Sequence, residues 1–181
     1  MPPYEVDAPK ALGALPRPDL GDLFFDFEGD PLYTEGDATV WGIDYLFGWV
    51  DIRDEYSAIW AHSFDEEKRA FEDFLDFVAA RRAAHPRLHI YHYAPYEPSA
   101  FKRLMGRYAT READVDRMLR AGLFVDLYAV VRRALRASVE RYSIKDLEQF
   151  YGFSRDVELA KANINLRVVE RALEAKAVAA I

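Results

Sequence analysis

The chain has 181 residues, of which 51% are hydrophobic and 14% aromatic, and its formal net charge is −7. This length suits one domain with a core of its own, and this composition excludes a disordered chain. The absence of cysteine excludes disulfides, thiol catalysis and cysteine-based zinc sites. The sequence has neither a signal-peptide pattern nor an apolar run of about 18 residues, which argues against secretion and membrane insertion and favours a cytoplasmic location.

Charge is distributed unevenly along the chain. Residues 1–63 carry 3 basic and 13 acidic side chains, whereas residues 102–145 carry 11 basic and 5 acidic ones. A basic stretch of this kind fits a surface that follows a phosphate backbone. Solvated helix faces are the more ordinary explanation for any single arginine in it, so the stretch alone does not establish a nucleic-acid partner.

Residues 1–20 show no periodic pattern of hydrophobic residues. They are rich in proline, which favours irregular backbone, and we expect a linker or an edge segment before a folded domain over residues 21–181. The chain ends at residues 177–181 in a pattern typical of a helix with an apolar face. Together these ends favour a domain that is cut from a larger protein and truncated at its C-terminus.

Three strands are predicted next, over residues 23–28, 40–50 and 56–62. The second has a strong alternation of large hydrophobic residues, which predicts that all of them lie on one face. These residues are Trp41, Ile43, Tyr45, Phe47 and Trp49. Short connections between the three strands favour an antiparallel meander.

Helical patterns dominate the rest of the chain. Ser63 and Glu66 form a capping box before a long amphipathic helix that ends near residue 85. Residues 88–93 are predicted to form a fourth strand, which a helical crossover places parallel to a neighbour. Further helices are predicted to start at Pro98 and to cover residues 111–121, 125–137 and 144–151. The order of these elements predicts an α/β fold with a mixed sheet, made of a three-strand antiparallel meander and parallel strands, flanked by helices.

The first predicted strand carries two carboxylates. Residues 22–31 read Asp-Leu-Phe-Phe-Asp-Phe-Glu-Gly-Asp-Pro, which puts Asp26 and Glu28 on one face and Phe25 and Phe27 on the other. Two acids about 7 Å apart are unusual in a core. They suit hydrated divalent cations, because Mg²⁺ takes one or two carboxylates and keeps positions for a substrate phosphate.

A third acid, Glu97, lies where the fourth strand passes into a helix. Ligands of α/β folds bind at this edge of the sheet. An acid favoured by the dipole of the helix in its first turn is an equally good explanation for Glu97. The histidines have no metal-ligand spacing on a common helix face, but His92 lies near the candidate site.

These acids resemble those of the DEDD exonucleases in the ribonuclease H-like superfamily. Asp26-Phe27-Glu28 matches the first motif of that family, and His92 to Glu97 resembles a divergent second motif. The likeness is closer to a branch of predicted nucleases with Asp-Phe-Glu-Gly-Asp-Pro, Tyr-Glu, Val-Asp-Leu-Tyr and Tyr-Ser-Ile-Lys motifs. Here these motifs stand at residues 26–31, 96–97, 125–128 and 142–145. In that branch the domain is usually fused to a RecB-family nuclease region and often to a helicase.

The fourth acid of the family departs from this match. The family carries it in a late Tyr-x-x-x-Asp motif, and residues Tyr142 to Asp146 fit that pattern. Ser143 and Asp146 also form a capping box, which needs no catalytic role. In the similar nucleases this segment precedes the last motif by several dozen residues. The resemblance therefore favours Asp146 as a cap and a fourth ligand beyond Ile181.

The resemblance implies a two-metal-ion nuclease that uses Mg²⁺ or Mn²⁺ to hydrolyse phosphodiester bonds. The expected catalytic residues and metal ligands are Asp26, Glu28 and Glu97. Weaker candidates for metal ligands are Asp126 and Asp146. The expected substrate contacts are His92, Tyr96 and Lys145.

The implied activity is that of a 3′–5′ exonuclease on DNA or RNA within a larger repair or helicase protein. The expected partners are a nucleic-acid strand end and the neighbouring nuclease and helicase domains. Two alternatives stay open. The first is a non-catalytic module that keeps the fold to bind nucleic acid or other domains, which the missing last acid and the glutamate at position 97 favour. The second is a metal-dependent phosphoesterase for small nucleotides.

Overall fold

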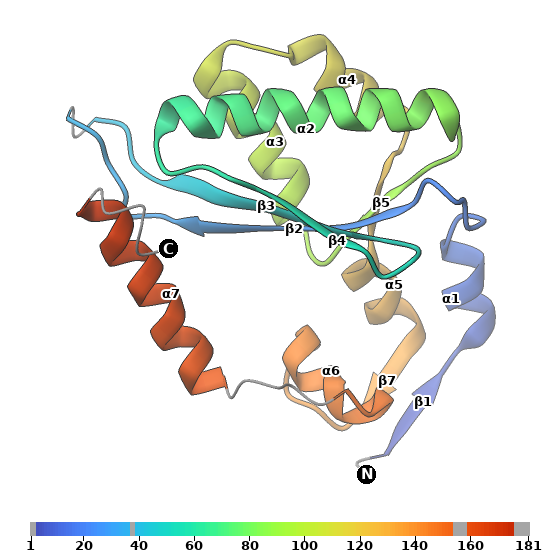
Figure 1. Ribbon diagram of the computed structural model, residues 1–181. Helices are drawn as coiled ribbons and strands as arrows, with labels where there is room; N and C mark the ends of the chain where they lie inside the picture. Colours follow the sequence, from blue (N-terminus) through green and yellow to red (C-terminus); the bar gives the residue numbers. More distant parts are fainter. Residues whose placement is uncertain (1–2, 37–38, 154–158, 176–181) are drawn as a thin grey trace.

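A five-stranded sheet forms the centre of the computed structural model, which describes residues 3–36, 39–153 and 159–175 (Figure 1). The strand order is β4-β3-β2-β5-β6. The strands are β2 (Leu23–Asp30), β3 (Ile43–Asp51), β4 (Tyr56–Trp60), β5 (Ile90–His92) and β6 (Phe124–Asp126). β2, β3 and β4 form an antiparallel meander, whereas β5 is parallel to both β2 and β6. The predicted mixed α/β sheet is therefore confirmed.

Three helices cover one face of this sheet: α2 (Phe64–Ala84), α3 (Tyr96–Tyr108) and α4 (Glu112–Arg120) (Figure 1). The predicted capping box begins α2, since the Glu66 amide donates to Ser63 Oγ at 3.2 Å. The main core lies between α2, α3 and the sheet, and it is rich in aromatic rings. Phe25 lies 4.5 Å from Phe74 and 5.7 Å from Phe101 between ring centroids, spacings typical of favourable aromatic pairs.

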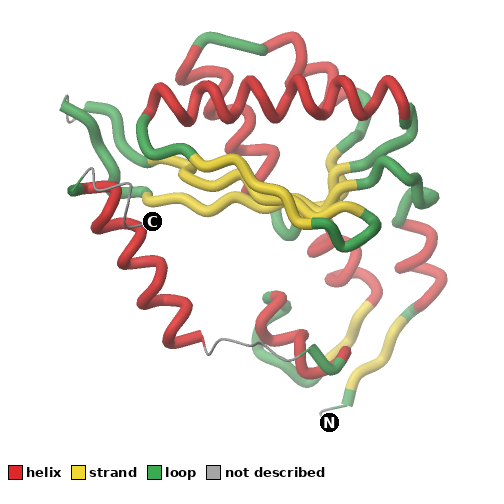
Figure 2. The backbone as a smooth tube through the Cα atoms, in the orientation of Figure 1, coloured by secondary structure: helices red, strands yellow, loops and turns green. Residues whose placement is uncertain are grey.

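The opposite side of the sheet carries α5 (Leu127–Ala134), α6 (Ile144–Tyr151) and α7 (Leu159–Glu174), and Figure 2 shows the strands between these two groups of helices. A smaller second core joins the sheet to α7, where Leu173 packs with Tyr33, Ile43 and Tyr45. The two cores divide the sheet into one face sealed by α2 and α3 and one face only partly covered.

A register shift in the pairing of β2 with β3 determines which residues of β3 lie in each core. Glu28 is opposite Leu46 but Gly29 is opposite Asp44, so Tyr45 has no partner on β2. Such a β-bulge reverses the alternation of side chains beyond it. The prediction that the large residues of this strand share one face is therefore wrong: Phe47 lies in the main core, whereas Ile43 and Tyr45 lie in the second one.

The first twenty residues contain more regular structure than the predicted linker. β1 (Tyr4–Val6) pairs antiparallel with β7 (Leu135–Ala137). α1 (Ala8–Ala14) follows, capped by Asp7, whose carboxylate accepts a hydrogen bond from the Lys10 amide at 3.3 Å. Local periodicity does not reveal such a strand, because its partner, β7, is far away in sequence.

The predicted helix over residues 125–137 is also wrong in its length. Residues 124–126 form β6, and α5 begins only after Asp126, whose carboxylate accepts hydrogen bonds from the Tyr128 and Ala129 amides. β7 then takes the last three residues of the predicted helix. This helix is therefore a short connection between two strands.

Other boundaries differ by a few residues. α3 begins at Tyr96, two residues before the predicted start, and β5 is shorter than predicted. α6 has the predicted bounds, and Gly152 ends it in the left-handed region at φ +71°. The predicted helix at residues 177–181 lies outside the described residues. No helix among the described residues is both long enough and apolar enough to cross a bilayer.

Leu104 tests the main core, because its side chain is fully buried between α3 and the sheet. We expect Leu104→Ala to lower the free energy of unfolding by about 2–5 kcal/mol through lost burial and a residual cavity. Leu12→Ala is the control, since Leu12 is 72% exposed on α1, and its effect should stay within about 0.5 kcal/mol. Urea denaturation measures both, and equal losses would contradict this assignment of the core.

Candidate active site

A cavity lies beside the second half of β2. β2 pairs with β5 only at Leu23 and Phe24, so further along this edge no strand of the described residues covers β2. The cavity occupies this place, and its walls come from β2, the segment before β3 and the start of α3. It measures about 580 Å³. Its lining includes Asp26, Trp41, Asp44, Tyr96, Glu97 and Arg103.

Two of the predicted catalytic acids meet at this cavity. Asp26 comes from β2 and Glu97 from the first turn of α3, and their carboxyl groups lie within hydrogen-bonding range of each other. The Asp26 residue is exposed as a whole, but partial burial of its carboxyl group, the contact with Glu97 and the charge of Glu28 together raise its pKa to about 7. Since two adjacent carboxylates repel, a proton or a cation between them stabilises the pair.

A strained turn places Glu97 beside Asp26. Ala94, between β5 and α3, has φ +72°, which costs a residue other than glycine about 1–2 kcal/mol. Two contacts hold the turn: the Ala94 amide donates to Asp126 Oδ1 at 3.1 Å, and the Ala94 carbonyl lies 2.7 Å from His92 Nδ1. Strain of this kind persists where the surrounding structure fixes it, and it is common at functional sites.

His92 is buried behind Glu97, with its Nδ1 3.1 Å from Glu97 Oε2. Burial opposes a charged imidazole, but Glu97, the Ala94 carbonyl and Asp126 outweigh it and raise the pKa of His92. His92 was predicted to contact substrate. The structure places His92 behind the Glu97 carboxylate, which lines the cavity, whereas His92 itself is not part of the cavity lining.

The geometry at Glu97 leaves one oxygen without a partner. Glu97 is 2% exposed, and its Oε2 atom accepts no hydrogen bond from the described residues. His92 Nδ1 is close to it, but this nitrogen is directed at the Ala94 carbonyl. Buried polar atoms normally find a partner, and an unsatisfied one indicates a missing ligand or a shared proton.

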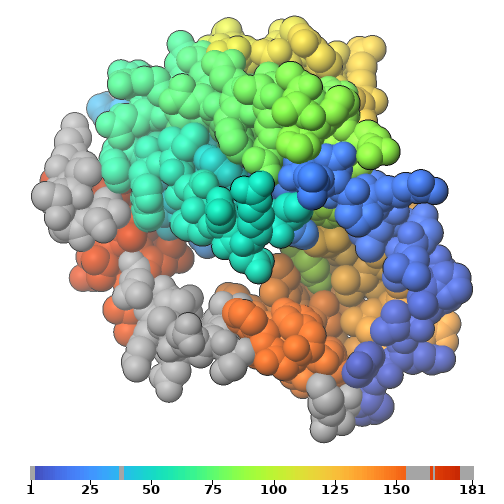
Figure 3. Space-filling model, turned by 45° about the vertical axis from the view of Figure 1, so that its right-hand side comes forward, coloured from blue at the N-terminus to red at the C-terminus, as the bar shows by residue number. Residues whose placement is uncertain are grey.

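Glu28 lies on the same face of β2 as Asp26, as the alternation predicts. Burial raises the pKa of Glu28, and the positive charge of Lys145 partly opposes this shift. Lys145 belongs to α6. The space-filling view shows a hollow between β4 and α6 (Figure 3). Tyr93 holds this region near the site, because its hydroxyl donates to the Tyr142 carbonyl just before α6.

The two weaker ligand candidates have structural partners. Asp126 Oδ1 accepts hydrogen bonds from the Ala94, Tyr128 and Ala129 amides, so this carboxylate both holds the strained turn and caps α5. Asp146 Oδ2 accepts a hydrogen bond from Ser143 Oγ at 2.7 Å, and the Asp146 amide donates back to Ser143 Oγ at 3.2 Å. The capping explanation of Asp146 thus matches its contacts.

Sequence reasoning missed Asp44, which is 1% exposed at the far end of the cavity. Its Oδ1 accepts a hydrogen bond from the Tyr96 hydroxyl at 2.7 Å, and its Oδ2 pairs with Arg103. Tyr96, predicted to contact substrate, therefore has its hydroxyl engaged, while 49% of the residue remains exposed. The available signal was an acid inside an apolar strand, which is costly unless it is paired.

Glu67 is a second acid that sequence reasoning missed, and it contacts the backbone of Asp44. It is fully buried on α2 and accepts hydrogen bonds from the Asp44 amide at 2.5 Å, from Arg107 at 2.9 Å and from the Tyr108 hydroxyl. Burial raises the pKa of Glu67, although these three partners favour its charged form. Arg107 also donates to the Trp41 and Gly42 carbonyls, which fixes the segment before β3.

Within the described residues, five of the eleven basic side chains in the predicted basic surface over residues 102–145 form ion pairs with neighbouring acids, among them Arg103 with Asp44. Arg107 pairs with Glu67, and Arg111 pairs with Asp76 at 2.6 Å. Further pairs on α4 join Arg117 to Asp114 and Arg120 to Asp116. These five arginines are therefore engaged with acids of the protein, whereas the predicted phosphate-binding role of the stretch stays a prediction.

The cavity, its carboxylates and the strands that carry them fall within one family match. A model of the RNase_H superfamily matches residues 23–168, from the first residue of β2 into α7. The chain belongs to the RNase H superfamily. A search of curated proteins and a search of solved structures found no match. RNase H superfamily domains are in general nucleases that use divalent metal ions.

The residues of this RNase H superfamily domain fit a divalent cation. Among the described residues no group of three or more acids or histidines is already arranged around a metal position. Mg²⁺ does not need one, because one or two carboxylates with water and substrate phosphate suffice. Asp26 and Glu97 offer hard oxygen ligands in contact with each other, and Glu97 Oε2 has a free acceptor position.

The pKa of Asp26 predicts how stability depends on pH in metal-free protein. Because its pKa rises from 3.8 to about 7 on folding, the native state binds the proton more tightly, and the free energy of unfolding falls as pH rises through this window. We expect the free energy of unfolding of Asp26→Asn not to fall in this pH window. The variant should therefore be more stable than the wild type at pH 8 and nearly as stable as the wild type at pH 4.

Urea denaturation in EDTA at several pH values measures this difference. Mn²⁺ should restore the stability of the wild type at pH 8 and leave the variant almost unchanged, since a ligand stabilises only a state that binds it. If the free energy of unfolding depends on pH in the same way in both proteins, Asp26 does not have the raised pKa.

Proposed function

We propose that this domain is a metal-dependent nuclease that hydrolyses phosphodiester bonds of DNA or RNA. The observation that carries the proposal is the contact between the Asp26 and Glu97 carboxyl groups at the edge of a cavity, with Glu28 on the same strand face. Clustered acids destabilise a metal-free site, and enzymes accept this cost where a cation completes the site.

Each residue of the site has a defined task in this proposal. Asp26 and Glu97 hold the metal ions from β2 and α3, and Glu28 adds a third carboxylate. When bound, the ions supply Lewis-acid activation of water and of the phosphate. His92 keeps the Glu97 carboxylate in position through its 3.1 Å contact. Lys145, whose charge acts on Glu28, meets the phosphate backbone from the side of α6.

We further propose a two-ion 3′–5′ exonuclease of the DEDD type, acting within a larger repair or helicase protein that carries a RecB-family nuclease region. The Asp-Phe-Glu-Gly-Asp-Pro motif of β2 supports this narrower assignment, together with Glu97 in the place of the second-motif acid. In this proposal the parent protein is cytoplasmic, and residues 21–181 are its exonuclease domain.

A non-catalytic module is the second candidate. It is supported by Asp146, whose carboxylate is engaged with Ser143, and by the lack of a preassembled three-ligand cluster in the described part of the chain. Such a module would retain the fold to bind a strand or a neighbouring domain.

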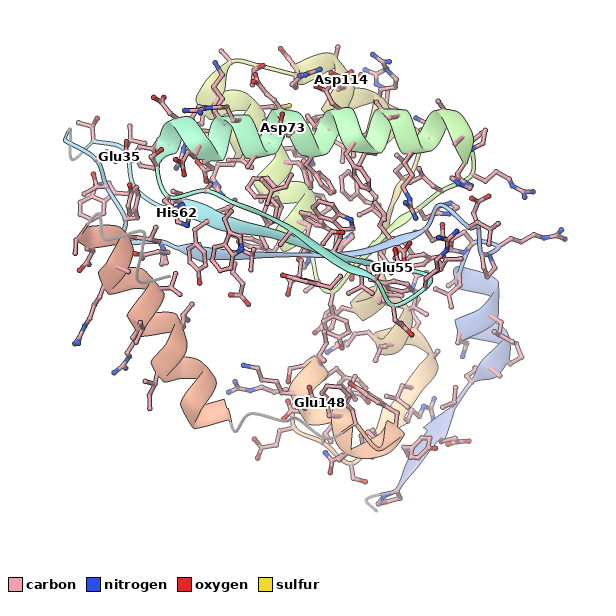
Figure 4. All side chains as sticks on the ribbon, in the orientation of Figure 1. Glu35, Glu55, His62, Asp73, Asp114 and Glu148 are labelled. Carbon is pink, nitrogen blue, oxygen red and sulfur yellow. The ribbon has the colours of Figure 1, made fainter. Side chains whose placement is uncertain are left out.

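Substitution of the paired acids tests the nuclease. We expect Asp26→Asn and Glu97→Gln each to lower Mn²⁺-dependent degradation of an end-labelled single strand by about 100-fold or more, because each removes a metal ligand. Asp73→Asn is the matched control: Asp73 is exposed on α2, which lies across the sheet from α6 with its labelled Glu148 (Figure 4). DNA and RNA strands are tested in parallel on denaturing gels.

Closed circular single strands distinguish the exonuclease from an endonuclease in the same assay, since an exonuclease leaves them intact. If both acid variants degrade linear strands as fast as the Asp73 control, the site is not catalytic and the proposal fails.

Metal binding separates the nuclease from the non-catalytic module. We expect calorimetric titration of Mn²⁺ into the wild type to show binding that Glu28→Gln weakens by about 10-fold or more, because this variant removes one carboxylate from the cluster. Asp73→Asn again serves as the control. An absence of Mn²⁺ binding at millimolar concentrations would favour the module.

A further inference from the structure

We propose that the cavity beside Asp26 holds a single nucleotide unit at a strand end, with Arg103 binding its phosphate and the rings of Trp41 and Tyr96 flanking its base. This inference rests on the proposed nuclease function and extends it by assigning the substrate class and residues outside the acidic cluster. No comparison or motif points to Arg103, Trp41 or Asp44 for this role.

The dimensions of the cavity match one nucleotide. Its volume of about 580 Å³ lies within the range of about 300–1,000 Å³ that encloses drug-sized ligands, the size class of a nucleoside monophosphate. A base-paired duplex end is too wide for such a space. The cavity begins at the Asp26 and Glu97 carboxylates, so a nucleotide inside it lies next to the proposed site of hydrolysis.

Aromatic rings form two parts of its wall. Trp41 is 52% exposed in the segment before β3, and Tyr96 is 49% exposed at the start of α3. Large rings with so much exposed surface are costly in water, and in nucleic-acid-binding proteins they serve as platforms on which bases stack without sequence preference. Their place on two different elements suits contact with a base that enters between them.

Arg103 supplies the positive charge that an anion needs here. The other charged residues of the lining are acids, whose field repels a phosphate unless a cation intervenes. In the described part of the chain, Arg103 is the only arginine or lysine that lines this cavity. Its pairing with Asp44 uses one terminal nitrogen, whereas a guanidinium carries five N–H donors, so donors remain for a phosphate.

One buried carboxylate positions both the proposed phosphate donor and one aromatic wall. Asp44 holds Arg103 with one oxygen and the Tyr96 hydroxyl with the other. Its own backbone amide donates to Glu67, which is fully buried. Binding groups whose orientation is fixed before the ligand arrives lose little entropy on binding. The ion pair with Arg103 and the hydrogen bond from Tyr96 offset the free-energy cost of burying the Asp44 charge.

Calorimetry with deoxyadenosine 5′-monophosphate as the probe tests the subsite in the full chain. We expect Arg103→Met to weaken binding of this nucleotide by about 10-fold or more and to leave binding of deoxyadenosine, which lacks the phosphate, nearly unchanged. Trp41→Ala should weaken both ligands by about 10-fold, because stacking does not involve the phosphate. Lys102→Met is the matched control, since Lys102 is the exposed neighbour of Arg103 on α3.

Two further measurements guard against a merely structural effect. Arg103→Lys keeps the positive charge beside Asp44 but loses the planar guanidinium group that can bind a phosphate through two donors. This variant should retain the melting temperature and bind the nucleotide with intermediate affinity. Trp41→Phe keeps an aromatic ring at this half-exposed position, so it should retain most of the affinity for both ligands.

The outcomes separate this inference from the nuclease itself. If the wild type degrades strands but Arg103→Met and Trp41→Ala bind the nucleotide as tightly as it does, the subsite is wrong and the nuclease stands. If the nucleotide binds with the expected sensitivities but no strand is degraded, the subsite stands and the nuclease is wrong. Failure of the wild type to bind the nucleotide at millimolar concentration overturns the inference.

Discussion

The extra residue in β3 is the constraint on which the rest of this structure depends. Tyr45 has no partner on β2, and beyond it the two faces of β3 are exchanged. Without that exchange Asp44 would point toward α7 and Ile43 toward α2. With it, Asp44 turns to α3, and Ile43 joins the second core. A single inserted residue therefore places the carboxylate that orients one wall of the cavity.

Buried charge is the second organising feature, and it follows from the first. Burying Asp44 and Glu67 costs free energy that only complete hydrogen bonding and pairing can offset. Arg103 and Arg107 supply the charges, and the Tyr96 and Tyr108 hydroxyls supply further donors. The resulting network links β3 to α2 and α3, so the cavity wall has one defined arrangement. Removal of Arg107 alone would leave the Glu67 charge uncompensated in the interior, which costs more free energy than replacement of the whole pair by apolar side chains.

The acids of the candidate site were easier to select from the sequence than the contacts that support them. Asp26 and Glu28 were visible because a strand alternates strictly, and Glu97 was visible because it follows a strand end. Asp44, Glu67 and the β1–β7 pair were not, because each depends on partners distant in sequence. The same reason explains the failed helix over residues 125–137, where the Asp126 cap competes with helical periodicity. Tertiary contacts thus account for most of what local patterns missed.

The site combines a destabilised group with a rigid support. Partial burial, Glu97 and Glu28 favour the protonated form of Asp26, and Ala94 holds a strained backbone turn before Glu97. Both features cost stability in the absence of a cation. Asp126 offsets part of this cost by fixing the Ala94 amide, and it also caps α5. Because one carboxylate makes both contacts, a change at Asp126 would loosen the turn before Glu97 as well as the start of α5. The contacts of Asp126 thus join the end of β5, the start of α5 and the turn that leads to Glu97.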